Sequence, residues 1–192
     1  DIDHTVAAAL PISGLTAWQA LFDHARLVAG QTVLVHGAAG GVGSIAVQLA
    51  REVGARVIGS GRAHDRDVVL GLGANVFLDL EADKWESVGA VDVVLDVVGG
   101  EVTGRSAEII RAGGTLVTIV EPTTVQPEGG RTIFFVVEAD RARLSDLALR
   151  VRDGSLTPIV GAVRPLSEAP SAFRRDRRTP GKTIIEIAPG DC

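Results

Sequence analysis

The stretch Val33-Leu-Val-His-Gly-Ala-Ala-Gly-Gly-Val-Gly43 decides the fold of this 192-residue chain. A short strand rich in β-branched residues runs into a glycine-rich turn. A helical apolar pattern follows, at Val42, Ile45, Ala46, Leu49 and Val53. The glycines let backbone N–H groups approach a pyrophosphate, and the helix N-terminus adds partial positive charge at the same place. This order predicts the phosphate-binding unit of a dinucleotide fold.

The turn departs from the usual G-x-G-x-x-G spacing at its first position, where Ala38 precedes Gly40 and Gly43. Glycine-rich turns are common, so the alternative is an ordinary βα turn that binds nothing. The strand before the turn and the helix after it favour the ligand-binding interpretation.

Strands and helices alternate along the rest of the chain, as expected of right-handed βαβ units. The run from Val91 to Val97 is almost continuously apolar, which is typical of a parallel strand covered on both faces. We therefore predict an α/β Rossmann fold with a doubly wound, parallel, six-stranded sheet in the order 3-2-1-4-5-6. The expected strands lie near residues 32–36, 56–60, 75–79, 92–97, 115–120 and 132–137, with helices near 41–53, 64–72 and 100–111.

Three regions are expected. Residues 1–28 link into the fold through a helix from Thr16 to about Val28, which Gly30 closes as a C-cap. Residues 29–158 form the nucleotide-binding domain and end with a helix near 139–152. Residues 159–192, with strands near 159–163 and 183–187 and a short helix near 167–173, break the alternation and are predicted to be pieces of a second domain.

Composition narrows the function classes. The net charge of −5 gives no support for a nucleic-acid partner or a membrane surface. No apolar run reaches the ~18 residues that a membrane span needs. The single cysteine, Cys192, excludes an intrachain disulfide and favours a cytoplasmic location. The basic cluster Arg174–Arg178 is expected to be a solvated helix end.

The end of the second strand selects the cofactor in such folds, because an acid about 20 residues past the glycine turn binds the ribose of NAD. Here the sequence is Ser60-Gly61-Arg62, without an acid at the tip. Arg62 can pair with a 2′-phosphate, with Ser60 as a donor beside it, which favours NADP. The alternative is a solvated loop arginine. Asp65 is expected to cap the next helix.

Two further polar residues border the predicted nucleotide site. His36 ends the first strand and is expected to shape the glycine turn rather than carry protons. Asp96, at the end of the fourth strand, could orient a loop at the carboxyl edge of the sheet.

Several ordered motifs resemble the medium-chain dehydrogenase/reductase superfamily, over about residues 6 to 187. They are Ala9-Leu-Pro11 with Gly14-Leu-Thr-Ala17, the glycine turn from His36 to Gly43, Val93–Gly100 and Gly113–Val117. The branch they resemble is the zinc-independent, quinone-oxidoreductase-like one. Ser13 stands where zinc-containing members have a cysteine ligand.

The resemblance implies a two-domain subunit whose N-terminal, GroES-like catalytic domain is absent from this chain, with residues 159–192 returning toward it. It implies no metal ligand and no catalytic residue here, and a homodimer that joins sixth strands. Thr16 is expected near the nicotinamide, and Lys182 is a weaker candidate near the cofactor phosphates. The pyrophosphate residues are expected to be Gly40, Gly41, Val42 and Gly43, and those bordering the nicotinamide Ile119, Val120, Phe134, Phe135 and Val136.

The function so implied is an NADPH-dependent oxidoreductase that transfers hydride to a small-molecule quinone or enone. An enoyl-thioester reductase is the nearest alternative, and a nucleotide-binding module without activity of its own is another. A methyltransferase is a more distant one, since it would normally have an acid at the second strand tip. The isolated chain is expected to bind cofactor without efficient turnover.

Overall fold

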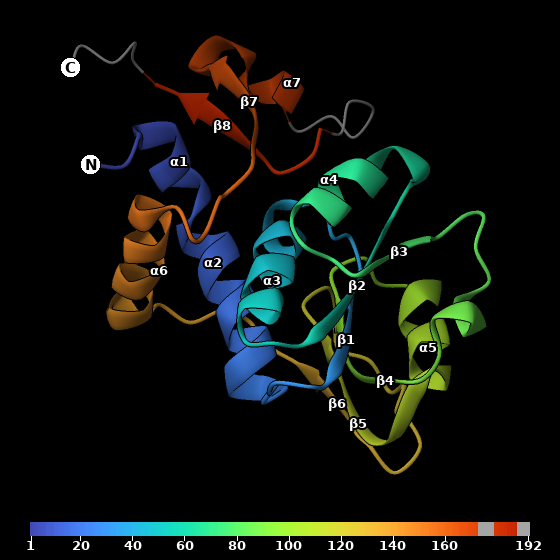
Figure 1. The fold of residues 1–192 in the computed structure, drawn as a ribbon. Coiled ribbons are helices and arrows are strands. Elements are labelled where there is room, and N and C mark those ends of the chain that lie inside the picture. The colour runs from blue at the N-terminus through green and yellow to red at the C-terminus, as the bar shows by residue number, and fades with distance from the viewer. Residues whose placement is uncertain (173–178, 188–192) are drawn as a thin grey trace.

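The structure is a computed structural model and describes residues 1–172 and 179–187. A large parallel sheet carries helices on both faces, and a small two-stranded sheet lies apart from it (Figure 1). The order of the large sheet is β3-β2-β1-β4-β5-β6, so the predicted doubly wound α/β topology is confirmed. Its strands are β1 (Thr32–Val35), β2 (Arg56–Gly61), β3 (Val76–Asp79), β4 (Val91–Asp96), β5 (Ile110–Thr118) and β6 (Arg131–Phe134).

The helices follow the predicted alternation. The α-helices are α1 (His4–Ala9), α2 (Pro11–Trp18), α3 (Gly41–Glu52), α4 (Arg66–Gly71), α5 (Glu101–Glu108), α6 (Arg141–Asp153) and α7 (Ala169–Ala172). Short 3₁₀ turns lie at Ala63–Asp65, Trp85–Val88 and Leu166–Glu168. None of the helices in the described ranges combines the length and apolar content that a membrane crossing requires.

The sheet separates two apolar layers, and β1 contributes to both. Val33 and Val35 pack with residues of α2, α3 and α6, such as Leu147. Leu34 points to the opposite face, where it joins a cluster that contains Trp85. Because both faces are covered, an almost unbroken run of apolar residues is the expected sequence of these strands.

The N-terminal region differs from the prediction. Residues 1–13 hold α1 and the start of α2. The carboxylate of Asp3 caps α1, because it accepts hydrogen bonds from the N–H groups of Thr5 (2.8 Å) and Val6. Pro11 stands at the first turn of α2, where its missing N–H costs nothing.

The expected C-cap at Gly30 is wrong. The helix continues through a π-helical turn at Gln19–His24 and ends there. Arg26, rather than a glycine, takes the left-handed conformation (φ 55°), and the Leu27 N–H returns to the carbonyl of Leu21 at 2.8 Å.

Two strand boundaries also differ. The predicted helix near 100–111 ends at Glu108, and β5 begins at Ile110 with a register irregularity against β4. The last predicted strand, 132–137, ends at Phe134. Beyond it Phe135 is buried, with its ring centroid 4.3 Å from that of His24. The side chain of Gln19 holds both backbone groups of Glu138, which draws the chain away from the sheet.

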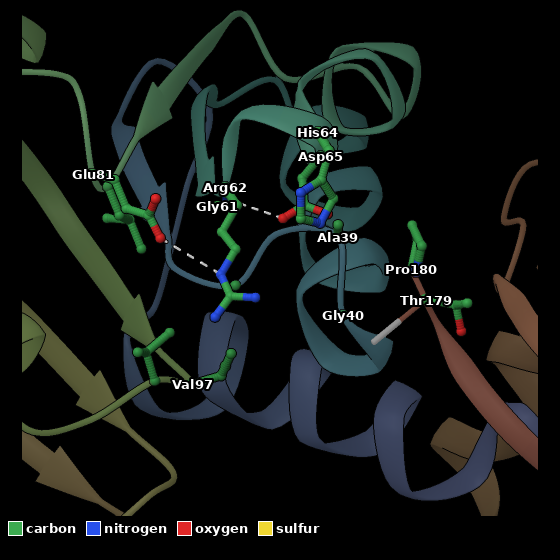
Figure 2. Close-up of a pocket in the computed structure, with 13 residues that line it drawn as sticks. Ala39, Gly40, Gly61, Arg62, His64, Asp65, Glu81, Val97, Thr179 and Pro180 are labelled. Carbon is green, nitrogen blue, oxygen red and sulfur yellow. Dashed lines mark hydrogen bonds and ion pairs between the residues drawn. The ribbon is translucent and has the colours of Figure 1, made fainter. Parts of the chain in front are cut away.

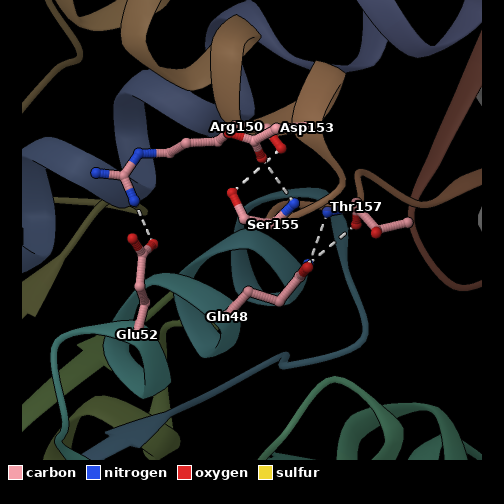
Figure 3. A network of polar contacts seen from close by, with 6 residues as sticks. All are labelled: Gln48, Glu52, Arg150, Asp153, Ser155 and Thr157. Atoms are coloured by element: carbon pink, nitrogen blue, oxygen red, sulfur yellow. Dashed lines mark hydrogen bonds and ion pairs between the residues drawn. The ribbon is translucent and has the colours of Figure 1, made fainter.

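The C-terminal region forms the second, parallel sheet from β7 (Val160–Pro165) and β8 (Lys182–Glu186), beside α1 (Figure 1). The amide of Gln48 on α3 bonds to both backbone groups of Thr157 at 3.0 and 2.9 Å, and Arg150 of α6 pairs with Glu52 of α3 (Figure 3). These contacts fasten the link between α6 and β7 to the main fold. The Arg174–Arg178 cluster, the end of the short helix at Phe173, and Cys192 lie outside the described residues.

Candidate functional site

The backbone packs closely on itself at the glycine turn. The N–H of His36 donates to Leu95 of β4 at 2.9 Å, and Gly37 then takes a positive φ of 61°. A Cβ on Gly43 would lie 2.2 Å from the carbonyl oxygen of Gly37, so no side chain fits where α3 passes the turn. No described side chain caps the helix, whose N-cap residue is Gly40. Its first N–H groups are therefore available to an anion.

A cavity of about 510 Å³ opens beside this turn, within the range of small-molecule sites. It lies past the carboxyl ends of β1 to β4, where the strand order reverses, which is the usual ligand position in doubly wound sheets. Of the predicted cofactor residues, Gly40 and Arg62 line it. The remaining lining residues are Gly37, Ala39, Gly61, His64, Asp65, Leu80, Glu81, Val97, Val98, Thr179 and Pro180.

Arg62 extends from the end of β2 toward Glu81, which follows β3 (Figure 2). The guanidinium Nε lies 3.7 Å from a carboxylate oxygen of Glu81, and both side chains are well exposed. The sequence analysis did not predict Glu81, because it placed cofactor selection at the end of the second strand alone. The position of this acid, two residues beyond the third strand, is the sequence feature that indicates it.

Asp65 stands at the N-cap position of α4, but its side chain makes no capping hydrogen bond to that helix, contrary to the expectation. Its Oδ2 atom accepts from the N–H of Arg62 at 3.0 Å, at the start of the 3₁₀ turn before α4. A Cβ on Gly61 would lie 2.7 Å from the same oxygen, so the carboxylate occupies the space beside the strand tip. Asp65 thus brings a second acid to the cavity from the next element.

Ser60 lies elsewhere. It is buried, and its hydroxyl is 2.7 Å from Nδ1 of His36 rather than among the groups that line the cavity. The other ring nitrogen of His36 lies 2.9 Å from Oγ of Ser106, which itself donates to the carbonyl of Val102 at 2.6 Å. Ser106 therefore accepts from Nε2–H, and Nδ1 accepts from Ser60. Both nitrogens of His36 are occupied in the interior.

Burial is the largest cause of the lowered pKa of His36, which falls from 6.5 to about 4. The charge of Asp96 raises this pKa by a smaller amount, and that of Arg105 lowers it. The imidazole is thus neutral at physiological pH. This fits the expectation that His36 shapes the turn rather than transfers protons.

Asp96 orients the loop after β4, as the sequence suggested. One of its oxygens accepts from the N–H groups of Val98 and Gly99, each at 2.9 Å. The other accepts from the hydroxyl of Thr103 at 2.6 Å. These three bonds hold Val98 at the cavity wall.

The residues expected near the nicotinamide lie outside the cavity lining. Thr16 is buried in α2, and its hydroxyl donates to the carbonyl of Ile12 at 2.6 Å. Ile119 packs against the core, whereas Val120, Phe134 and Val136 are exposed. Since Thr118 pairs with Phe134 in the parallel register, these three exposed side chains lie at or just beyond the ends of the neighbouring strands β5 and β6. Val42 packs against the core.

Lys182 lies against the glycine turn. A Cβ on Gly41 would be 2.9–3.0 Å from the side-chain carbons of Lys182. The backbone is joined there too, because the N–H of Gly181 donates to the carbonyl of Ala39 at 2.7 Å. Strand β8 thereby brings a cation to the start of α3.

No group of three or more His, Cys, Asp or Glu side chains in residues 1–172 and 179–187 is placed to hold a metal ion. Ser13 is fully buried in α2, and its hydroxyl has no hydrogen-bond partner among the described residues. Within the described ranges, the side chains therefore do not form a metal-binding set.

Comparisons with known proteins agree with this architecture. The family model described as zinc-binding dehydrogenase matches residues 72–185. The polyketide synthase GfsB of Streptomyces halstedii is 34% identical over 95% of this chain but only 4% of its own length. The 2-methylene-furan-3-one reductase of Solanum lycopersicum is 32% identical over 95% of this chain and 47% of its own.

Solved structures are similar over nearly the whole chain. The quinone oxidoreductase of Coxiella burnetii superimposes with a TM-score of 0.87 at 28% identity, covering 94% of this chain and 60% of that one. The mycobacterial protein Rv1454c in complex with NADPH gives 0.81 at 27%, covering 96% and 65%. The CurK enoyl reductase gives 0.80 at 25%, covering 97% and 64%.

The chain spans less than two thirds of the length of each of these proteins. The matched model extends over more than half of the chain, and the fold, the glycine turn and the relatives agree. The chain belongs to the zinc-binding dehydrogenase family of the medium-chain dehydrogenase/reductase superfamily.

Proposed function

We propose that this chain is the cofactor-binding part of an NADPH-dependent reductase of quinones or enones. The observation that carries the proposal is the uncapped N-terminus of α3, which faces a cavity at the reversal of strand order with Arg62 in its wall. The reductases among the relatives support the oxidoreductase class. The NADPH complex of a structural relative supports the cofactor.

The residues present fit a dinucleotide. Gly37 and Gly43 stand where a Cβ would meet other atoms at 2.7 and 2.2 Å, so the turn leaves its backbone open to a pyrophosphate. In this proposal the backbone of residues 40–43 holds the pyrophosphate, with Lys182 beside it. Arg62 holds the 2′-phosphate.

The nicotinamide would lie against the exposed apolar edge formed by Val120, Phe134 and Val136, with Ile119, Phe135 and Thr16 supporting that edge from within. When bound, the cofactor supplies the hydride, and the protein binds and orients it. No side chain of this chain is assigned a proton transfer.

Binding calorimetry with NADPH and NADH tests the proposal. A charge-assisted Arg–phosphate contact contributes roughly 1.5–3 kcal/mol. Arg62→Ala should therefore weaken NADPH binding about ten- to a hundredfold and leave NADH almost unchanged. Arg164→Ala is the matched control, because it removes another arginine paired with a glutamate, this one half-buried and outside the cavity. Equal affinity of the wild type for both cofactors would contradict the NADPH preference.

The enoyl-thioester reductase is the second candidate, and similarity to the CurK enoyl reductase favours it. A turnover assay of the full-length protein with NADPH and a panel of quinones, enones and enoyl thioesters separates the two. We further infer that these 192 residues alone bind cofactor without efficient turnover, as a nucleotide-binding module would. The side chains of Val120, Phe134 and Val136 are exposed to solvent, and catalysis needs a positioned substrate away from water. Robust reduction by the isolated chain would overturn this.

Assembly and location complete the proposal. β6 is an edge strand of the sheet, and Phe134 and Val136 beside it are exposed. Exposed apolar edges are usually paired or covered, so we infer a homodimer through this strand. Light scattering at micromolar concentration tests it, and a monomer would contradict it. The single cysteine is consistent with a cytoplasmic location.

A further inference from the structure

We propose that Glu81 is a selectivity-determining residue, which competes with the cofactor's 2′-phosphate for the guanidinium of Arg62. The inference rests on the proposed function and deepens it. In this view the choice between NADPH and NADH depends on residues at the ends of both β2 and β3.

The backbone fixes Glu81 opposite Arg62. Gly61 at the end of β2 pairs with Asp79 at the end of β3, and the N–H of Leu80 donates to the carbonyl of Gly61 at 3.0 Å. The N–H of Glu81 is held in turn by Oδ1 of Asp79 at 3.0 Å. The two charged side chains therefore leave adjacent strand ends and line the same cavity (Figure 2).

The ion pair can be exchanged. The side chains of Arg62 and Glu81 are 62% and 77% exposed, and their charged atoms are 3.7 Å apart. Exposed pairs of this kind contribute little to stability, so a better anion can displace the carboxylate. The guanidinium is thus positioned to bind a phosphate, but it is already paired with the carboxylate of Glu81, which the phosphate must displace.

The charge of Glu81 acts on the two cofactors differently. An anion bound to Arg62 would stand within one Debye length of the Glu81 carboxylate, which repels it. A ribose 2′-hydroxyl carries no charge and can donate a hydrogen bond to a carboxylate. Asp65 is less available to accept a hydrogen bond from the ribose, because its Oδ2 already accepts from the N–H of Arg62 and its side chain is only 17% exposed.

Glu81→Gln tests the inference by calorimetry on the whole 192-residue chain. NADPH should bind roughly three- to tenfold more tightly at low ionic strength, and the gain should shrink as salt is added. NADH should not bind more tightly. The gain should also be smaller in an Arg62→Ala background, because part of it comes from releasing the guanidinium.

Glu168→Gln is the matched control. It removes the same charge from another ion pair, that with Arg164 at 3.1 Å, and should change neither affinity. An unchanged NADPH affinity in Glu81→Gln, or an equal gain for NADH, would overturn the inference.

The outcomes also separate the two proposals. If Arg62→Ala weakens NADPH binding while Glu81→Gln has no effect, the proposed function stands and the role of Glu81 falls. If Arg62→Ala has no effect on NADPH, or if the wild type binds neither nucleotide, both fall.

Discussion

Nδ1 of His36 lies 2.7 Å from the hydroxyl of Ser60, and this contact joins the end of β1 to the end of β2 inside the protein. The same imidazole reaches Ser106 on α5 through Nε2 at 2.9 Å. One buried ring therefore connects the strand that precedes the glycine turn, the strand that precedes Arg62, and α5 on the opposite face of the sheet. Because the ring is buried, protonating it would place an unfavourable charge in the interior.

The free energy of unfolding should fall as the pH drops through the range from 6.5 to about 4. The folded state holds the pKa of His36 near 4, whereas an unfolded histidine binds its proton near 6.5. Because the unfolded state binds more protons between these values, stability rises with pH there, and His36 contributes about 2 kcal/mol between pH 5 and pH 7.5.

Urea unfolding of wild type and His36→Gln at both pH values checks this. The variant keeps hydrogen-bonding groups but has no titration in this range, so it should lose that part of the pH dependence. The carboxylates and other histidines are common to both proteins. If the free energy of unfolding changed equally between the two pH values in both proteins, His36 would not be the cause of the pH dependence.

Gly43→Ala should destabilise the fold and remove nucleotide binding. The new methyl group would stand 2.2 Å from the Gly37 carbonyl oxygen, which is backbone and cannot rotate away. Opening the turn should cost about 1–3 kcal/mol, as overpacking usually does. Thermal unfolding and NADPH titration measure the two effects.

Gly104→Ala provides the contrast within the same chain. Gly104 lies within α5, and nothing stands within 4 Å of the position of its missing Cβ. Alanine is the better helix former, so this variant should be as stable as wild type or up to about 1 kcal/mol more stable. If both substitutions had the same effect, the close approach at Gly43 would not explain its glycine.

The sheet could be predicted from the sequence because its signals are local. Alternation of apolar strands with helical patterns sufficed for the order of six strands, and the glycine turn identified the central one. The two N-terminal helices also have local signals, in Asp3 as a cap and Pro11 at a first turn.

Other features depend on contacts between distant residues. Arg26 takes the conformation that usually favours glycine, and no local pattern at Arg26 predicts this. The early end of β6 depends on Gln19, 119 residues away from Glu138. At the site, the backbone turn was predictable, whereas the position of Glu81 opposite Arg62 follows from the pairing of β2 with β3.

Lys182→Met should weaken the binding of NADPH and NADH to the same extent. The methylene chain of Lys182 packs on Gly41 at the start of α3, and methionine keeps this apolar contact while removing the charge. Both cofactors carry the same pyrophosphate, so the loss should be roughly tenfold for each, as for a hydrogen bond to a charged group.

The comparison with Arg62 makes the test specific, because Arg62→Ala should affect NADPH alone. Arg141→Met, which removes an exposed cation at the start of α6, should leave both affinities unchanged and controls for net charge. A loss confined to NADPH would assign Lys182 to the 2′-phosphate instead. No loss for either nucleotide would mean that β8 supports the glycine turn through its backbone alone, by the bond from Gly181 to Ala39.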